Sequence, residues 1–368
     1  MKVSFIDLLA QDAELKNDLA LAIENVTDSA QFSSGSFVSN FEESFADFCD
    51  SRYCVGVNSG TSALHLSLIA HGIGPGDEVI TVPNSFISTA WAISYVGATP
   101  KFVDIKPDTF LIDAKNIEKC ITKDTKAIIP VHLYGQPADM NEINSIAKNY
   151  HLKVIEDGAQ SHAAKYRNKK IGSLGNSVCF SFYPGKNLGA YGEAGAITTN
   201  ELSIYNKLIA LRNHGQSEKY KHDILGFNYR MDGIQGAVLK VKLKSLDKWT
   251  SRRNEICKYY DEAFSDIEQL QSIKIKSYNY SSRHLYLLHF QRRDELINYL
   301  NENNVQTGIH YPIPIHLQKA YSFLNHKIGD FPVAERNAST CLSLPLYYGL
   351  KDDEVLYVID LIKKYFNN

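Results

Sequence analysis

The chain has 368 residues and a formal net charge of −2, because 39 lysines and arginines nearly balance 41 aspartates and glutamates. With 44% hydrophobic and 22% charged residues, the composition is that of a folded globular protein and excludes disordered and collagen-like classes. So small a net charge supplies no overall field for nucleic acid or an anionic membrane, and we expect neither as a partner. At about 150 residues per domain, the length fits one large domain or two interlocked ones.

The chain also lacks the marks of secreted, membrane and zinc proteins. No run reaches the roughly 18 apolar residues that a membrane helix needs, and the N-terminus has no signal-peptide core, so we expect a cytoplasmic protein. The 6 cysteines are scattered without a CxxC pair and are expected to be reduced core thiols. The 12 histidines include no HExxH pattern, and no metal is expected.

The first half of the chain alternates short β-rich runs with longer segments of helical character, a pattern typical of a mainly parallel sheet covered by helices. The expected strands are residues 54–57, 78–82, 101–103, 127–131, 153–156, 178–182 and 196–199. The expected crossover helices are residues 62–71, 85–96 and 140–150.

After about residue 233 the sequence pattern changes to a charged amphipathic run, which predicts one long helix over residues 235–264. That helix would cross toward a smaller α+β domain. The expected elements there are a strand at residues 285–290 and helices at 293–303 and 353–366. We therefore divide the chain into a large domain, residues 1–245 with an N-terminal helical segment, and a small domain, residues 246–368.

A turn of small residues joins the first expected strand to its helix. Backbone N–H groups near Gly60, the helix dipole and the hydroxyls of Thr61 and Ser62 would suit a phosphate. An ordinary capped helix start needs the same residue types, so the turn alone leaves both interpretations open.

An apolar strand over residues 153–156 leads directly into Asp157, at the carboxyl end where open α/β sheets place ligands. Asp157 could hold a proton on a heteroaromatic nitrogen, or it could cap the next turn. Both interpretations stay open on this residue alone.

A third strand leads through Ser181 into a glycine-flanked turn that carries Lys186. Burial lowers the pKa of a lysine and allows it to form an imine with an aldehyde, whereas a surface lysine would have no such role. Pyridoxal 5′-phosphate (PLP) needs a phosphate cradle, a carboxylate opposite its ring nitrogen and a lysine for its aldehyde. The three features together therefore predict a PLP site.

These residues and the segments around them resemble the DegT/DnrJ/EryC1/StrS sugar aminotransferases, which are fold-type I PLP enzymes that act on nucleotide-linked ketosugars. The likeness extends from residues 5–8 to residues 342–346, nearly the whole chain. Its strongest segments are residues 57–64 (VNSGTSAL), 130–140 (PVHLYGQPADM), 156–160 (EDGAQ), 181–188 (SFYPGKNL) and 308–312 (GIHYP). The resemblance implies an aspartate-aminotransferase-like α/β fold, with a three-layer αβα large domain and a smaller C-terminal α+β domain.

The resemblance also implies roles for individual residues. Lys186 would bind the cofactor aldehyde, Asp157 the ring nitrogen and Gln160 the ring hydroxyl, with Phe86 stacked on the ring. Gly60, Thr61 and Ser181 would hold the phosphate, and Asn228 would reach the phosphate of a neighbouring subunit, which makes the active sites of a homodimer shared. The residues implied for the sugar nucleotide are Lys219 and Tyr220 near the diphosphate, and Tyr183, His310 and Tyr311 near the hexose.

The implied reaction is a transamination in which L-glutamate converts PLP to pyridoxamine phosphate, which then aminates a ketosugar. The segment 135–140 is most similar to the 3-aminating members, so we expect dTDP-3-keto-6-deoxyhexose as substrate and a dTDP-3-amino-3,6-dideoxyhexose for O-antigen or other glycan assembly. A 4-keto sugar is the close alternative. A PLP sugar dehydratase would carry histidine in place of Lys186, and a regulatory relative without turnover is the remaining alternative.

Overall fold

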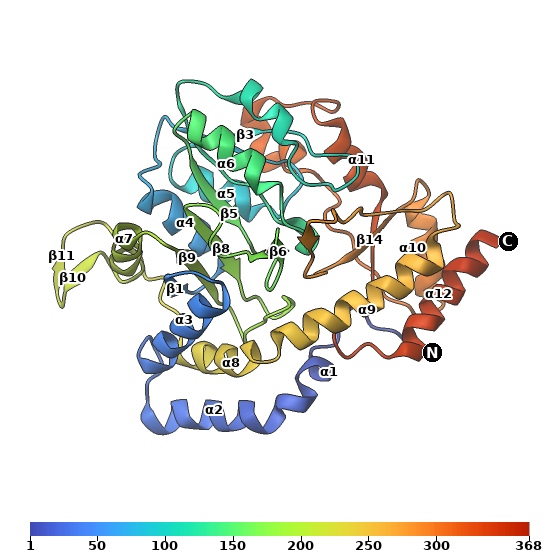
Figure 1. Cartoon of the computed structure of the whole chain (residues 1–368), viewed down its shortest axis with the longest axis horizontal. Helices are drawn as coiled ribbons and strands as arrows, with labels where there is room; N and C mark the ends of the chain where they lie inside the picture. Colours follow the sequence, from blue (N-terminus) through green and yellow to red (C-terminus); the bar gives the residue numbers. More distant parts are fainter. Residues whose placement is uncertain (368) are drawn as a thin grey trace.

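The computed structural model describes residues 1–367, and a seven-stranded sheet forms its centre (Figure 1). The strand order is β1-β9-β8-β5-β4-β2-β3. Strands β3, β2, β4, β5 and β8 run parallel, whereas β9 is antiparallel to both of its neighbours, so that β1 regains the common direction. The strands are β1 (Tyr53–Val57), β2 (Glu78–Thr81), β3 (Thr99–Phe102), β4 (Thr125–Ile128), β5 (Lys153–Asp157), β8 (Ser177–Ser181) and β9 (Gly195–Thr199).

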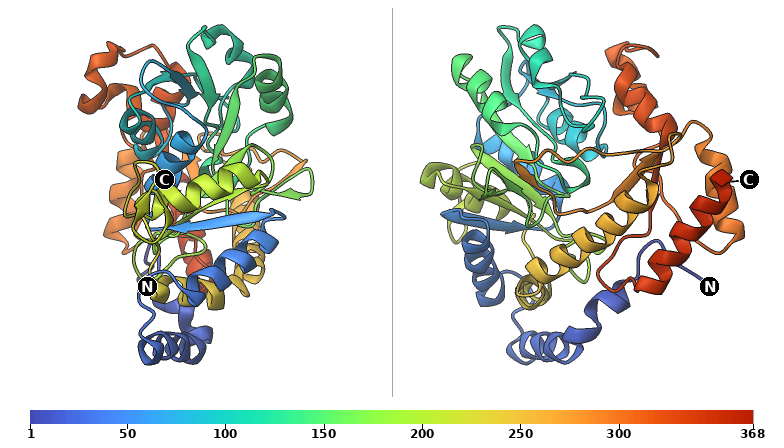
Figure 2. Two further views of the ribbon diagram at one scale, coloured as in Figure 1. Left: turned by 90° about the vertical axis from the view of Figure 1, so that its left-hand side faces the viewer. Right: turned by 45° about the vertical axis from the view of Figure 1, so that its right-hand side comes forward.

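Successive residues of each strand enter two different apolar cores, as the period of two along a strand requires. In β8, for example, Val178 and Phe180 belong to one core and Cys179 to the other. One core contains residues of α3, α6 and α8, and the other contains residues of α4, α5 and α7. The sheet therefore lies between two helical layers, and Figure 2 shows it from two further sides. The expected three-layer αβα fold is confirmed.

The described residues form twelve α-helices. Those of the first part are α1 (Leu8–Asp12), α2 (Lys16–Ser29), α3 (Ser36–Phe48), α4 (Gly60–Ala70), α5 (Ser88–Tyr95), α6 (Met140–Asn149), α7 (Leu202–Arg212) and α8 (Gly233–Leu243). Those of the second part are α9 (Leu246–Phe264), α10 (Arg293–Glu302), α11 (Pro332–Thr340) and α12 (Asp352–Asn367).

Two expected helices need correction. The single helix over 235–264 was wrong: α8 ends at Leu243 and α9 begins at Leu246. Helix α8 packs against α2 and α3, whereas α9 packs against α12, so the chain changes direction between two different partners (Figure 1). The helix expected from residue 85 begins only at Ser88, because residues 85–87 form the turn after β2 and the Ser85 hydroxyl is hydrogen-bonded to Thr89.

A smaller antiparallel sheet, β12 (Gln271–Ser272), β14 (Tyr286–His289) and β15 (Cys341–Leu344), packs with α9, α10 and α12 around a separate core. Chain segments cross in both directions between the two parts: Val3 lies in the small core, and Phe331 lies in the large one. The boundary at 245/246 stays our proposal, and it coincides with the break between α8 and α9.

Two further small strand groups lie outside these sheets. Strand β13 (Asn279–Tyr280) joins β6 (Lys165–Tyr166) and β7 (Lys169–Lys170), and β10 (Gln216–Glu218) pairs with β11 (Lys221–His222) in a hairpin. The six cysteines are free, and five of them are buried. None of the helices within residues 1–367 combines the length and apolar character that crossing a membrane demands.

We expect Phe45→Ala to lower the free energy of unfolding by about 3–5 kcal/mol, as for other large-to-small core changes. Phe45 is fully buried in α3, and its ring meets those of Phe180 and Phe182 at centroid distances of 5.0 and 5.2 Å. Urea unfolding followed by circular dichroism measures the loss. The matched control is Phe323→Ala, at a ring that is 62% exposed, which should change stability by less than about 0.5 kcal/mol.

Candidate active site

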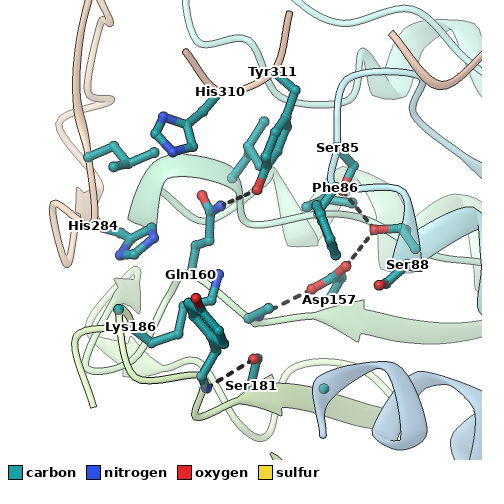
Figure 3. Close-up of a pocket in the computed structure, with 18 of the residues that line it drawn as sticks. Ser85, Phe86, Ser88, Asp157, Gln160, Ser181, Lys186, His284, His310 and Tyr311 are labelled. Carbon is teal, nitrogen blue, oxygen red and sulfur yellow. Dashed lines mark hydrogen bonds between the residues drawn. The ribbon is translucent and has the colours of Figure 1, made fainter. Parts of the chain in front are cut away.

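The turns that follow β1, β2, β5 and β8 meet at one edge of the sheet, because these strands share a direction and their carboxyl ends lie together. They enclose a cavity of about 800 Å³, closed on its other side by residues of the small domain such as His310 and Tyr311 (Figure 3). A space of this size is typical of a small-molecule site.

One end of the cavity lies at the start of α4. Ser59 caps this helix, since its Oγ accepts from Ser62 N at 3.1 Å. A Cβ on Gly60 would lie 2.6 Å from Cβ of Ser181, so only glycine allows α4 to approach β8 this closely. Thr61 Oγ1 donates to Ser88 Oγ at 2.9 Å, and both residues line the cavity. Helix N–H groups and several hydroxyls therefore converge where an anion would be stabilised.

Asp157 ends β5 and is 6% exposed. Its Oδ2 accepts from Thr89 Oγ1 at 2.7 Å, and its Oδ1 accepts from Ala159 N at 3.1 Å (Figure 3). Burial raises the pKa of Asp157, and these hydrogen bonds together with the charge of Lys186 oppose the shift. The side chain is thus a positioned carboxyl group that can hold a proton on a ligand.

Lys186 lies in the turn after β8, on the other side of the cavity from Asp157 (Figure 3). Its backbone N–H donates to Tyr183 O at 2.8 Å. Burial lowers the pKa of Lys186 to about 8, and the charge of Asp157 opposes this shift. At pH 7 about a tenth of the amine is therefore unprotonated and nucleophilic, far more than for a lysine of ordinary pKa.

Gln160 connects the sheet edge to the small domain. Its Oε1 accepts from Tyr134 N at 2.7 Å, and its Nε2 donates to Tyr311 OH at 3.2 Å. The ring of Phe86, which is 52% exposed, lies 5.7 Å from that of Tyr311. Both rings border the cavity and leave room for a flat ligand to contact Phe86.

Ten of the residues singled out in the sequence line this one cavity. They are Gly60, Thr61, Phe86, Asp157, Gln160, Ser181, Tyr183, Lys186, His310 and Tyr311. Ser62 lies beside it, but its hydroxyl donates to Asn58 Oδ1 at 2.6 Å within the helix cap. The structure places these groups together without assigning a role to any of them.

The chain does not bring Lys219, Tyr220 and Asn228 to its own cavity. Lys219 and Tyr220 lie at the turn of the β10–β11 hairpin, which projects away from the body of the molecule (Figure 1). Tyr220 is 81% exposed, and Asn228, also exposed, follows the hairpin. These three residues therefore lie outside the cavity of their own chain.

Sequence reasoning missed several residues of the cavity. Ser88 and Thr89 begin α5. They are polar residues that follow strand β2 of the same sheet, and this pattern could have marked them as residues of the site. His284 and Arg253 come from the small domain, far away in the chain. No local pattern marks them, because only the packing of the two domains brings them to this edge.

The donor set fits PLP. The start of α4 with the hydroxyls of Thr61, Ser88 and Ser181 suits a phosphate, Asp157 suits a protonated ring nitrogen, and the amine of Lys186 suits an aldehyde. These groups line one cavity, as the binding of a single flat cofactor with one phosphate arm requires.

The pKa of Lys186 predicts how its reactivity depends on pH. Only the free base reacts with acetic anhydride, so in the apoenzyme the labelling rate of Lys186 should rise with pH and reach half its maximum near pH 8. Exposed lysines should do so only near pH 10.4. Peptide mass spectrometry measures the labelling rates of Lys186 and of exposed lysines in one sample. Equal midpoint pH values for the two would contradict the effect of burial on Lys186.

Thr89→Val should weaken the binding of PLP roughly tenfold, because a hydrogen bond to a charged group is removed from Asp157. Without it the pKa of Asp157 rises further, and the carboxylate is less able to hold a ring proton. Equilibrium dialysis of PLP measures the affinity. Thr198→Val is the matched control, since that buried hydroxyl donates to Gly172 O at 2.7 Å instead.

Comparison with known proteins agrees with this geometry. The family model for the DegT/DnrJ/EryC1/StrS aminotransferase family matches residues 13–363. The chain is 43% identical to the dTDP-3-amino-3,6-dideoxy-alpha-D-galactopyranose transaminase of Aneurinibacillus thermoaerophilus, over 99% of each chain.

Two solved structures are similar over the whole chain. DesV of S. venezuelae, in complex with a ketimine intermediate, has a TM-score of 0.98 at 39% identity, covering 100% of this chain and 99% of that one. NtdA of Bacillus subtilis, with bound cofactor PMP, has a TM-score of 0.92 at 32% identity, covering 100% and 86%. This chain is therefore an enzyme of the DegT/DnrJ/EryC1/StrS aminotransferase family.

Proposed function

We propose that this aminotransferase moves the amino group of L-glutamate to carbon 3 of a dTDP-linked 3-keto-6-deoxyhexose. The products are 2-oxoglutarate and a dTDP-3-amino-3,6-dideoxyhexose, a precursor for O-antigen or other glycans assembled from cytoplasmic nucleotide sugars. The observation that carries the transamination is the placement of Lys186, with its lowered pKa, opposite Asp157 in one cavity.

The cofactor is PLP. When bound, it supplies an electron sink that stabilises negative charge on the carbon next to the transferred amine. Asp157 would hold the proton of its ring nitrogen, and Thr89 Oγ1 and Ala159 N keep the carboxylate oriented for that task. The hydroxyls around the start of α4 would hold its phosphate.

Lys186 would act twice. Its neutral amine binds the cofactor aldehyde in the resting enzyme, and once released the same Nζ takes a proton from the donor carbon. In the second half of the reaction it returns a proton to the sugar carbon. A pKa of about 8 suits both tasks, because the amine is able to gain and lose a proton near neutral pH.

On the sugar side, Tyr183, His310 and Tyr311 border the open part of the cavity. Burial lowers the pKa of His310 to about 4, and the charge of Lys186 adds to the shift. His310 is therefore neutral at pH 7, and its Nδ1 lies 2.9 Å from Ser343 Oγ. A neutral ring suits a hexose hydroxyl, to which it offers hydrogen bonding without a charge.

The choice of carbon 3 and of dTDP is supported by the 43% identity to the A. thermoaerophilus enzyme. For the partner, we propose a homodimer in which a second copy of the chain supplies Asn228 to the phosphate and Lys219 and Tyr220 to the sugar diphosphate. The exposure of all three residues, and the projection of their hairpin, support this assignment.

Incubation with L-glutamate and a panel of 3-keto and 4-keto sugar nucleotides tests the proposal. We expect an aminosugar with nitrogen at carbon 3, identified by mass spectrometry and NMR, with 2-oxoglutarate in equal amount. Nitrogen at carbon 4 would identify a 4-aminotransferase, and failure with every dTDP-ketosugar would refute the substrate assigned.

Lys186→Ala should abolish turnover and the visible absorption of the lysine-bound cofactor, while circular dichroism stays unchanged. Full activity in this variant is incompatible with the role of Lys186. If glutamate leaves the cofactor absorption of the wild type unchanged, the protein is a regulatory relative without turnover.

A further inference from the structure

A buried tyrosine next to the cavity holds a strained backbone conformation and has no assigned role. Tyr134 follows Leu133, which lines the cavity, and its own side chain is 3% exposed. Its φ of +62° falls in the left-handed region, which bulky residues adopt rarely. Such a conformation persists where the surrounding structure holds it in place, and it often marks a residue with a functional task.

The backbone of Tyr134 joins the cofactor edge of the sheet to the small domain. Its N–H donates to Oε1 of Gln160 at 2.7 Å, and its carbonyl accepts from the N–H of His284 at 3.1 Å. The carbonyl of the next residue, Gly135, accepts from the N–H of Ser282 at 2.9 Å. A Cβ on Gly135 would lie 2.6 Å from Ser282 Oγ, so glycine allows this close approach of the two domains.

The hydroxyl of Tyr134 reaches a second segment of the small domain. It donates to the carbonyl of His310 at 2.8 Å. It also accepts from Nδ2 of Asn337 at 3.1 Å, which leaves the proton of the hydroxyl directed at His310. Burial raises the pKa of Tyr134 well above its usual value, so the hydroxyl keeps this proton near neutral pH.

Tyr134 is thus connected to both of the adjacent residues that border the open part of the cavity. The first connection is the hydrogen bond from its hydroxyl to His310 O. The second runs through Gln160, whose Nε2 donates to Tyr311 OH at 3.2 Å (Figure 3). The ring of His310 is held by the small domain, since its Nδ1 lies 2.9 Å from Ser343 Oγ. The bonds of Tyr134 therefore connect this ring to the cofactor edge.

We propose that Tyr134 is a positioning residue for the ketosugar. It holds the backbone of His310 against the edge of the sheet, so that the side chains of His310 and Tyr311 lie where the hexose is bound. Tyr134 is not among the residues that line the cavity, so it acts through these neighbours. The inference rests on the proposed function, and it assigns Tyr134 to the sugar half of the reaction alone.

Tyr134→Phe tests the proposal, because it removes the hydroxyl and keeps both the ring and the backbone bond to Gln160. We expect KM for the ketosugar to rise roughly fivefold, the usual effect of one hydrogen bond. KM for glutamate and the rate of the glutamate half-reaction should stay the same. Steady-state assays measure the two KM values, and stopped-flow absorption of the cofactor measures the half-reaction.

Tyr260→Phe is the matched control. Its hydroxyl is also buried and also donates to a backbone carbonyl, that of Pro345 at 3.1 Å, outside the cavity. Urea unfolding should show a similar loss of stability in both variants, but KM for the ketosugar should rise only in Tyr134→Phe. An unchanged KM in Tyr134→Phe, or an equal rise for both substrates, would overturn the proposal.

Hydrogen exchange separates this inference from the proposed function, because it needs no substrate. In the PLP-loaded enzyme, Tyr134→Phe should speed exchange roughly fivefold in peptides that cover residues 308–312, and leave β14 unchanged. Faster exchange there in an enzyme that aminates no ketosugar would support the positioning role and refute the function. Unchanged exchange would overturn the positioning role, even if the enzyme aminates a sugar.

A second variant decides the outcome if Tyr134→Phe fails to fold. Asn337→Leu keeps a side chain of similar volume and removes the amide that directs the Tyr134 hydroxyl at His310. We expect the same changes in KM for the ketosugar and in exchange over residues 308–312, at roughly twofold. Wild-type values for both in this variant would overturn the proposal.

Discussion

The whole site depends on a carboxylate and an amine that are both withdrawn from water and placed at opposite sides of one cavity. Burial alone would neutralise each of them, raising the pKa of Asp157 and lowering that of Lys186. Each side chain partly opposes the shift of the other through its charge. This balance leaves an amine that titrates near neutral pH, and a carboxylate held by two hydrogen bonds.

Parallel pairing makes that arrangement possible. Strands β5 and β8 are neighbours, with Asp157 opposite Cys179 in register, so the turns after both strands open at the same edge. The reversed strand β9 lies beyond β8 and places Gly195 against Ser59 and Gly60, which brings α4 and its N–H groups to the same edge. The positions of Lys186, of Asp157 and of the start of α4 around one cavity are therefore consequences of one sheet topology.

The small domain adds the groups that would distinguish the substrates. His284 and His310 are neutral, because burial and neighbouring positive charges disfavour a further charge. Arg253, whose Nη1 donates to three backbone carbonyls, also lines the cavity and keeps its charge at pH 7. The start of α4, with its N–H groups and the hydroxyls beside it, is the end of the cavity that suits an anion.

The sequence by itself determined the sheet and the family, and it predicted the candidate cofactor residues that the structure brings to one cavity. The strands are short runs of apolar residues, Asp157 ends one of them, and Lys186 lies in the turn after the neighbouring one, so local patterns were enough. Only the tertiary structure decided that α8 and α9 are separate, that Tyr220 points away from the chain's own cavity, and that Arg253 enters it. These features depend on packing between residues that are far apart in the chain. The residues next to Arg253 in the sequence do not indicate that its charge is buried without a counter-charge among residues 1–367.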